Sequence, residues 1–191
     1  MAPTNVLDFW FGAPGSATHG QRRNEWFTKD DAFDALIRER FGALIEDTLA
    51  GAHRDWSESA EGALARIVVL DQFTRNVFRG TPRAFAGDAL AQATARQVVA
   101  RGWDAQLLPE QRPFVYLPFE HAEDLATQRE SLRLFAALSA ADAALADYEA
   151  YARAHHDIIE RFGRFPHRNA ILGRASTPEE VEFLKQPGSS F

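Results

Sequence analysis

Apolar side chains recur every three or four residues between residues 33 and 49. This spacing places them on one face of an α-helix, with Asp30 or Asp31 positioned to cap its start and Gly51 to end it. The apolar positions are Phe33, Leu36, Ile37, Phe41, Leu44, Ile45 and Leu49. The pattern predicts an amphipathic helix.

A second helix is predicted after Ser57 or Ser59, either of which can cap its start. Residues 63–70 are almost continuously apolar, and the run ends at Asp71 and Gln72. A helix that is apolar around most of its circumference is buried on most sides. We therefore expect this segment in the interior.

Two threonines followed by proline mark further helix starts. Thr81 precedes an alanine-rich segment that runs to Gly102, and Thr177 has Glu180 at capping-box spacing. These signals predict that two arginine-rich stretches, "DQFTRNVFRGTPR" (71–83) and "RFGRFPHRNAILGR" (161–174), lie in turns between helices.

The segment from residue 109 to residue 162 also carries helix signals. Pro109 suits the start of a short helix, which Pro113 and Pro118 would kink. Residues 125–139 and 142–162 are predicted to form two further helices. No segment alternates between apolar and polar residues as a strand would.

These elements predict an all-α fold. We expect paired antiparallel helices in a compact tetratricopeptide-like bundle, with a single domain over residues 1–186 and a frayed tail over 187–191. A chain of 191 residues that is 46% hydrophobic is long enough to bury one core.

Composition excludes several classes of function. The net charge of -6 gives no overall field that would attract nucleic acid or an anionic membrane surface, and the absence of cysteine excludes disulfides and thiolate chemistry. No apolar run approaches the roughly 20 residues that span a bilayer. We expect a soluble, cytoplasmic protein without nucleic-acid or membrane partners, and its oligomeric state stays open.

Positive charge is concentrated locally despite the acidic total. Residues 161–174 hold four arginines and one histidine without an acid, and both arginine-rich stretches contain an Arg-Asn pair among apolar residues. Guanidinium groups match carboxylate and phosphate oxygens in pairs. We interpret the two stretches as halves of one ligand site. Its candidate residues are Arg75, Asn76, Arg79, Arg164, His167, Arg168 and Asn169.

The acidic counterpart of these arginines is predicted in the segment "FEHAED". Glu120 and Asp124 are four residues apart and His121 and Asp124 are three apart, so the three share a helix face. In one interpretation, the arginines line a cleft for a small anion or a carboxylate-bearing peptide. In the other, which we favour, the acids neutralise the arginines in an internal salt-bridge network that fixes the turns.

An enzyme is the alternative to a binding module. His121 and Glu120 would then transfer a proton on a phosphorylated or carboxylated metabolite. The sequence has no GxSxG, GxGxxG or GxxxxGK[ST] motif, so it gives no support for those hydrolases or nucleotide sites.

Metal binding is a weaker hypothesis. His121 with Glu120 and Asp124, or His156 with Glu160, would offer nitrogen and oxygen ligands for zinc or manganese. Neither HExxH nor a paired ExxH arrangement is present, so structural histidines are favoured. We therefore predict no metal and no cofactor.

Five long motifs in order resemble a known family. They are "VLDFWFG", "WFTKDDAFDALIRERF", "LDQFTRNVFRGTPRAFAGDAL", "YLPFEHAEDLATQ" and "ERFGRFPHRNAILGRASTPEEVEFL". Over almost the whole chain, they are similar to the bacterial domain-of-unknown-function family nine-two-four. The resemblance implies an all-helical fold similar to tetratricopeptide repeats and implies no activity.

Overall fold

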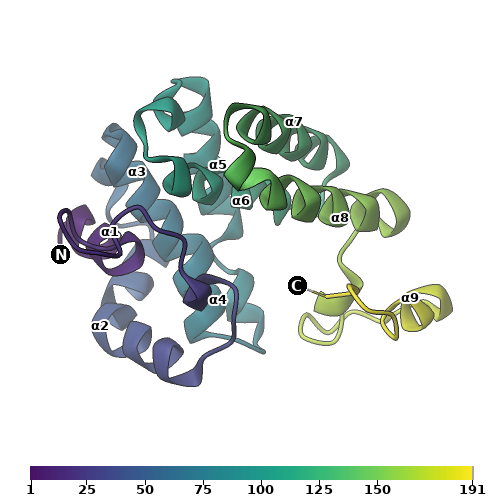
Figure 1. Cartoon of the computed structure of the whole chain (residues 1–191). Helices are drawn as coiled ribbons and strands as arrows, with labels where there is room; N and C mark the ends of the chain where they lie inside the picture. The colour runs from purple at the N-terminus through teal and green to yellow at the C-terminus, as the bar shows by residue number, and fades with distance from the viewer. Residues whose placement is uncertain (191) are drawn as a thin grey trace. The chain divides into compact units, whose positions relative to one another are not determined.

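The computed structural model describes residues 1–190, and the regular elements of this part of the chain are helical, which confirms the all-α prediction (Figure 1). The α-helices are α1 (Pro3–Phe11), α2 (Asp31–Leu49), α3 (Ala60–Ile67), α4 (Thr74–Val77), α5 (Asp88–Ala100), α6 (Arg112–Glu120), α7 (Leu125–Ala141), α8 (Ala146–Phe162) and α9 (Pro178–Phe183). Within residues 1–190, no helix has the length and apolarity that a membrane crossing requires.

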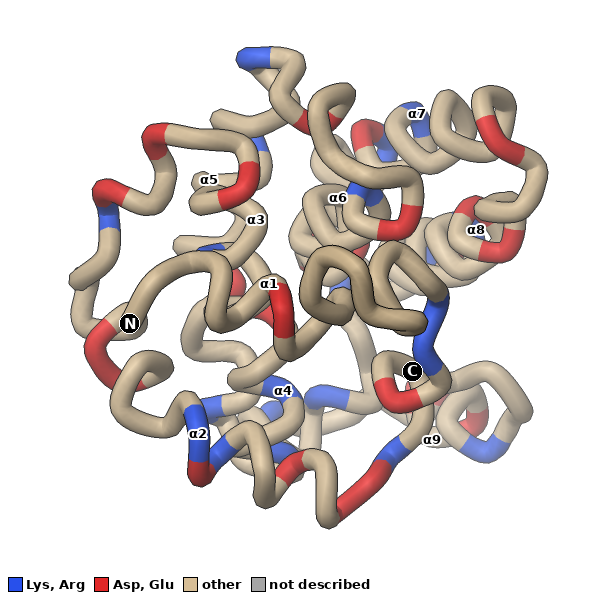
Figure 2. The backbone as a smooth tube through the Cα atoms, turned by 60° about the vertical axis from the view of Figure 1, so that its left-hand side comes forward, with Lys and Arg blue, Asp and Glu red and all other residues tan. Residues whose placement is uncertain are grey.

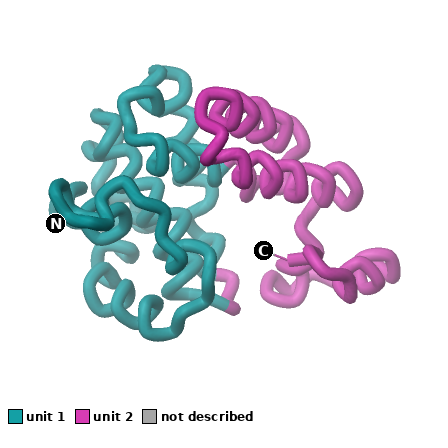
Figure 3. The backbone as a smooth tube through the Cα atoms, viewed as in Figure 1, with its two compact units in different colours: residues 1–79, 83–118 teal, residues 80–82, 119–191 magenta. Residues whose placement is uncertain are grey.

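The chain divides into two compact units (Figure 3). Unit 1 comprises residues 1–79 and 83–118, and unit 2 comprises residues 80–82 and 119–191. Acidic and basic positions are interspersed along both (Figure 2). Each unit is described by itself below, and the single domain over 1–186 stays a prediction.

An aromatic core holds unit 1 together. The ring of Phe73 lies 4.9 Å from that of Phe41 and 5.5 Å from that of Trp10, and Phe114 lies 5.1 Å from Phe11. All five side chains are buried. Such edge-on and offset contacts add stabilisation to the burial of apolar area, so α1 is fixed against the interior of this unit.

Helix α2 forms where the spacing predicts it. The carboxylate of Asp30 accepts hydrogen bonds from the backbone N–H groups of Ala32 and Phe33, which caps the first turn. After the last turn, Gly51 adopts a left-handed φ of 95°. Leu36, placed on the apolar face by the sequence pattern, is exposed instead.

The buried helix after Ser59 continues further than predicted. Ser59 caps α3 through Gly62 N–H, as expected, but a π-helix (Val68–Phe73) then joins α3 to α4. Arg75 and Asn76 therefore lie in helix α4, and the prediction that they lie in a turn is wrong. The apolar run stays buried through residue 74, so helical hydrogen bonding continues where the sequence suggested an end.

The two Thr-Pro signals have different outcomes. Thr177 accepts a hydrogen bond from Glu180 N–H and the Glu180 side chain accepts one from Thr177 N–H, which confirms the predicted capping box. The predicted helix from Thr81 to Gly102 is wrong at its start, because only a 3-10 turn (Pro82–Phe85) forms there and α5 begins at Asp88. Gly87, the residue before α5, lies directly against the backbone of Leu70.

In unit 2, α7 and α8 pack side by side as an antiparallel hairpin, joined by residues 142–145 (Figure 1). Gly163, in the left-handed conformation, ends α8 as predicted. The chain then forms a 3-10 turn (Pro166–Arg168), so the second arginine-rich stretch does lie in a connection between helices.

The predicted frayed tail includes residue 191, which lies outside the described residues. Within its described part, Ser189 is buried and its hydroxyl donates to the carbonyl oxygen of Leu184. This contact does not test the predicted domain boundary at residue 186, which stays a prediction.

Candidate functional site

The predicted site residues fall in both units. Arg75, Asn76 and Arg79 belong to unit 1, whereas Glu120 and the residues after it belong to unit 2. The joint site inferred from the sequence stays a prediction.

Arg75 is held between two carboxylates. Its Nη1 lies 3.1 Å from Asp71 Oδ1, and its Nη1 and Nη2 donate to Asp88 Oδ1 and Oδ2 at 2.9 and 3.2 Å. Burial alone would lower the pKa of Arg75, but the charges of Asp71 and Asp88 outweigh it and raise the pKa. The charge of Arg75 is thus neutralised from α5 and from the π-helix.

The carboxylate of Asp34, on α2, accepts hydrogen bonds from the two other predicted site residues of unit 1, Asn76 and Arg79. Asn76 Nδ2 donates to Asp34 Oδ1 at 2.6 Å, and Arg79 Nε donates to Asp34 Oδ2 at 3.0 Å. These bonds tie the end of α4 to α2. In unit 1 these contacts therefore agree with the interpretation as an internal ion-pair network, with Asp34, Asp71 and Asp88 as partners that the sequence analysis did not propose.

In unit 2, Glu180 organises the loop before α9. Arg164 Nε and Nη2 donate to its two carboxylate oxygens at 2.7 and 2.8 Å, and Asn169 Nδ2 lies 3.3 Å from Oε2. The side chain of Glu180 is 3% exposed. Arg164 and Asn169 thus position this loop.

A second carboxylate, Glu123, holds the same loop from the other side. It accepts from Arg174 Nη1 and Nη2 at 2.6 and 2.8 Å and from the backbone N–H of Phe165 at 2.8 Å. Its neighbour Asp124 caps α7 through Thr127 N–H at 2.7 Å. The predicted site residue Asp124 therefore has a local capping role, and Glu123, next to it, is one of the residues that sequence reasoning missed.

Glu120, His121 and His155 form a compact group at the end of α6 and on α8. Nδ1 of His155 lies 3.1 Å from Glu120 Oε1 and 2.9 Å from the carbonyl oxygen of Tyr151. Each of the three offers a nitrogen or oxygen atom within 4.8 Å of those of the others. Glu120 and His155 are buried, whereas His121 is half-buried. The half-buried imidazole thus lies beside a buried acid–imidazole pair.

Phe165 connects this group to the arginine-rich turn. The ring of His155 meets it edge-on at 5.5 Å, the ring of His167 lies 5.6 Å away, and the guanidinium of Arg168 lies 4.5 Å over its face. We define the histidine cluster as Glu120, His121, His155, Phe165, His167 and Arg168. His121, His167 and Arg168 were predicted as site residues, and the cluster brings them together.

The buried imidazole of His155 and the half-buried imidazole of His167 are neutral at pH 7. Burial, and then the charge of His121, lower the pKa of His155 to about 3. Burial, and then Arg168, lower the pKa of His167 to about 4. Both can therefore accept or donate a hydrogen bond without carrying charge.

A family model described as bacterial protein of unknown function (DUF924) matches residues 6–188. The chain belongs to the DUF924 family. It is also similar to the solved structure of a protein of unknown function from Agrobacterium tumefaciens, with 40% identity, 96% of each chain covered and a TM-score of 0.84. No curated protein matches the chain. The resemblance seen in the sequence motifs is thereby confirmed.

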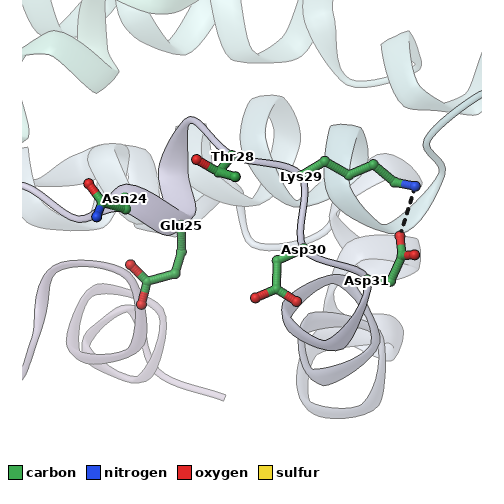
Figure 4. A pocket seen from close by; sticks show the side chains of 6 residues that line it. All are labelled: Asn24, Glu25, Thr28, Lys29, Asp30 and Asp31. Atoms are coloured by element: carbon green, nitrogen blue, oxygen red, sulfur yellow. Dashed lines mark ion pairs between the residues drawn. The ribbon is translucent and has the colours of Figure 1, made fainter.

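A shallow hollow of about 540 Å³ in this DUF924 protein lies on the loop before α2 (Figure 4). Its polar side chains have local roles: Asp30 caps α2, and Lys29 Nζ lies 3.1 Å from Asp31 Oδ1. It is lined by Asn24, Glu25, Thr28, Lys29, Asp30 and Asp31. The histidine cluster is the better candidate because its polar groups are buried and convergent.

The loop that carries Arg168 should loosen in acid. Hydrogen bonds from Arg164 lower the pKa of Glu180 to about 2 from an ordinary value of about 4.5, so its contribution to stability is present above about pH 4.5 and is lost as the pH falls toward 2. Urea unfolding at pH 7 and pH 3 measures this effect. Between these two pH values, the free energy of unfolding is expected to fall less for Glu180→Gln than for the unmodified DUF924 protein. An equal loss in both would contradict this role of Glu180.

Proposed function

We propose that this DUF924 protein is a binding protein that holds a small carboxylate or phosphate ligand in the histidine cluster. The observation that carries the proposal is the convergence of donors around Phe165: His155, His167 and Arg168 contact or approach this one ring. In a chain of net charge -6, such a local gathering of imidazole and guanidinium groups is suited to an anion.

The half-buried rings give a ligand its approach. His121 and His167 are both partly exposed, whereas Arg168 and Glu120 behind them are buried. A carboxylate or phosphate reaching the two rings could accept their N–H groups, with the charge of Arg168 close by. The loop that carries His167 and Arg168 is held in place by Glu123 and Glu180 in this proposal.

Thermal unfolding tests the binding proposal. At 100 times its dissociation constant a ligand stabilises the folded protein by about 2.7 kcal/mol, which raises the melting temperature of a chain of this size by about 5 to 10 °C. We expect at least one of inorganic phosphate, citrate and succinate to give such a rise, and His167→Ala to remove it.

His156→Ala is the matched control, since His156 lies on α8 next to His155 and contacts Asp157, outside the cluster. It should keep the ligand-induced rise in melting temperature. If no carboxylate or phosphate stabilises the protein, or if His167→Ala keeps the full rise, the binding proposal is wrong.

Proton-transfer catalysis is a second candidate, and one observation favours it. His121 combines partial exposure with a buried carboxylate–imidazole pair, Glu120 and His155, next to it. An imidazole in this setting can exchange a proton with a bound phosphorylated or carboxylated metabolite. Turnover of any such compound that disappears in His121→Ala and persists in His156→Ala would support the enzyme; turnover that persists in His121→Ala would reject it.

A further inference from the structure

We propose that Glu120, His121 and His155 bind one divalent transition-metal ion, with zinc as the best match. Two imidazoles and one carboxylate are a common ligand set for zinc sites that keep an open position. This inference goes beyond the proposed anion binding and does not depend on it.

The spacing of the three side chains carries the proposal. Their ligand atoms lie within 4.8 Å of one another. Ligands at zinc-bonding distances of about 2.0 to 2.2 Å stand about 3 to 4 Å apart around one ion. Small side-chain adjustments are therefore enough to close the set around a metal, without a change in the path of the backbone.

The surroundings already hold the ligands in place. Nδ1 of His155 lies 2.9 Å from the carbonyl oxygen of Tyr151 and 3.1 Å from Glu120 Oε1, so the metal would take Nε2 of this ring while Nδ1 keeps its outer contact, as in many metal-binding histidines. The backbone carbonyl oxygen of Glu120 accepts a 2.6 Å hydrogen bond from Gln128 Nε2. The ring of His155 and the backbone of Glu120 are thus each held by a neighbour on α8 or α7.

Gln128 gives a second, independent observation. Its Nε2 donates to the carbonyl oxygens of both Glu120 and Ala122, so the orientation of its amide is settled. Its Oε1 is then a buried acceptor with no hydrogen-bond partner within residues 1–190, and Ser131 Oγ, one turn along α7, is in the same condition. A buried polar group without a hydrogen-bond partner lowers the stability of the folded protein. Gln128 Oε1 belongs to the same amide as Nε2 and therefore lies near the backbone of Glu120, where a water bound to the proposed metal would offer it a donor.

Some charges around the cluster oppose the binding of a metal cation, and others favour it. The guanidinium of Arg168 lies 4.5 Å over the ring of Phe165, which the ring of His155 meets at 5.5 Å, and its positive charge opposes the binding of a cation. The negative carboxylate of Glu120, in contact with His155, favours the binding of a cation. Arg168 beside a metal ion would in turn favour an anionic ligand on the open position of that ion.

A second histidine–acid group within residues 1–190 serves as a contrast. His156, Asp157 and Glu160 also have ligand atoms within 4.8 Å, but both acids are exposed. Exposed acids group in this way without a metal, so we assign no site there. His156→Ala is therefore the matched control for the variants of the histidine cluster.

Isothermal titration of the full chain, stripped of metal with a chelator and kept in phosphate-free buffer, tests the proposal. We expect one equivalent of zinc to bind, and binding to weaken by at least about 100-fold in His121→Ala, because even residues outside the ligand set change affinity by about 10- to 100-fold. His156→Ala should bind as the unmodified protein does. Cobalt in place of zinc should give visible absorption bands of a nitrogen- and oxygen-ligated ion.

His121 is the half-buried member of the ligand set, so the His121→Ala protein should fold, and far-ultraviolet circular dichroism checks that it does. Glu120→Gln, which keeps the shape of the side chain, is the second variant. Absence of zinc binding, or full binding by a folded His121→Ala or Glu120→Gln protein, would overturn the metal site. Phosphate binding measured with chelator present tests the anion proposal separately, so the two failures are distinguishable.

Discussion

Gly87→Ala is expected to lower the free energy of unfolding by about 3 kcal/mol or more. A Cβ atom at Gly87 would overlap the carbonyl oxygen of Leu70 and lie 2.8 Å from its carbonyl carbon. Both atoms are backbone of the buried π-helix, so no side-chain rotation can relieve the overlap. The φ of Gly87 is -89°, so the expected cost comes from space and not from backbone conformation.

Urea unfolding at equilibrium measures this effect, with Gly42→Ala as the control. Gly42 lies inside α2, and nothing stands within 4 Å of the position of its Cβ atom. Alanine there should leave stability unchanged or raise it by up to about 1 kcal/mol, since glycine weakens a helix interior. Similar midpoints and slopes for the two variants would show that the contact between Gly87 and Leu70 is looser than described.

Arg168→Ala should lower the free energy of unfolding by about 3 kcal/mol, whereas Arg79→Ala should lower it by about 1 kcal/mol or less. Arg168 is 6% exposed and its guanidinium covers the buried ring of Phe165. Its removal opens a cavity there, and it also removes a positive charge that lowers the pKa of Glu123. The side chain of Arg79 is 42% exposed, so solvent replaces much of its ion pair with Asp34.

Denaturant midpoints of the two arginine variants decide this prediction. Equal and severe destabilisation by both would show that Arg79 is as important to the fold as Arg168. An Arg168→Ala variant as stable as the unmodified protein would instead indicate that burying the guanidinium of Arg168 costs the free protein as much as its contacts contribute, as happens in sites built for a ligand at the expense of stability.

Elements with local signals could be predicted from the sequence. The start of α2 depends on Asp30, and that of α9 on the pair Thr177 and Glu180, all within three residues of the groups they bind. The π-helix could not be predicted, because the apolar run that contains it fits a continuous α-helix equally well. The contact between Gly87 and Leu70, next to the start of α5, could not be predicted either, because the two residues meet only in the folded chain.

The candidate site was predictable in its residue types and not in its partners. Asn76 and Asp34 are 42 positions apart, and so are Phe165 and Glu123, a separation at which no local spacing rule applies. A weak signal existed for one missed residue. His155 follows Tyr148 and Ala152 at steps of four and three, on the buried face of α8, and an imidazole at an apolar position indicates a partner in the interior.

The π-helix also makes the length of its segment a constraint. An α-helix turns by about 100° per residue, so deleting one residue from Val68–Phe73 while keeping the segment helical would rotate α4 by that angle. Arg75 would swing away from Asp88, and Asn76 away from Asp34, although every side chain of the network was still present. Insertions and deletions in this stretch are therefore expected to be far less tolerated than conservative substitutions, whereas the opposite holds for most surface loops.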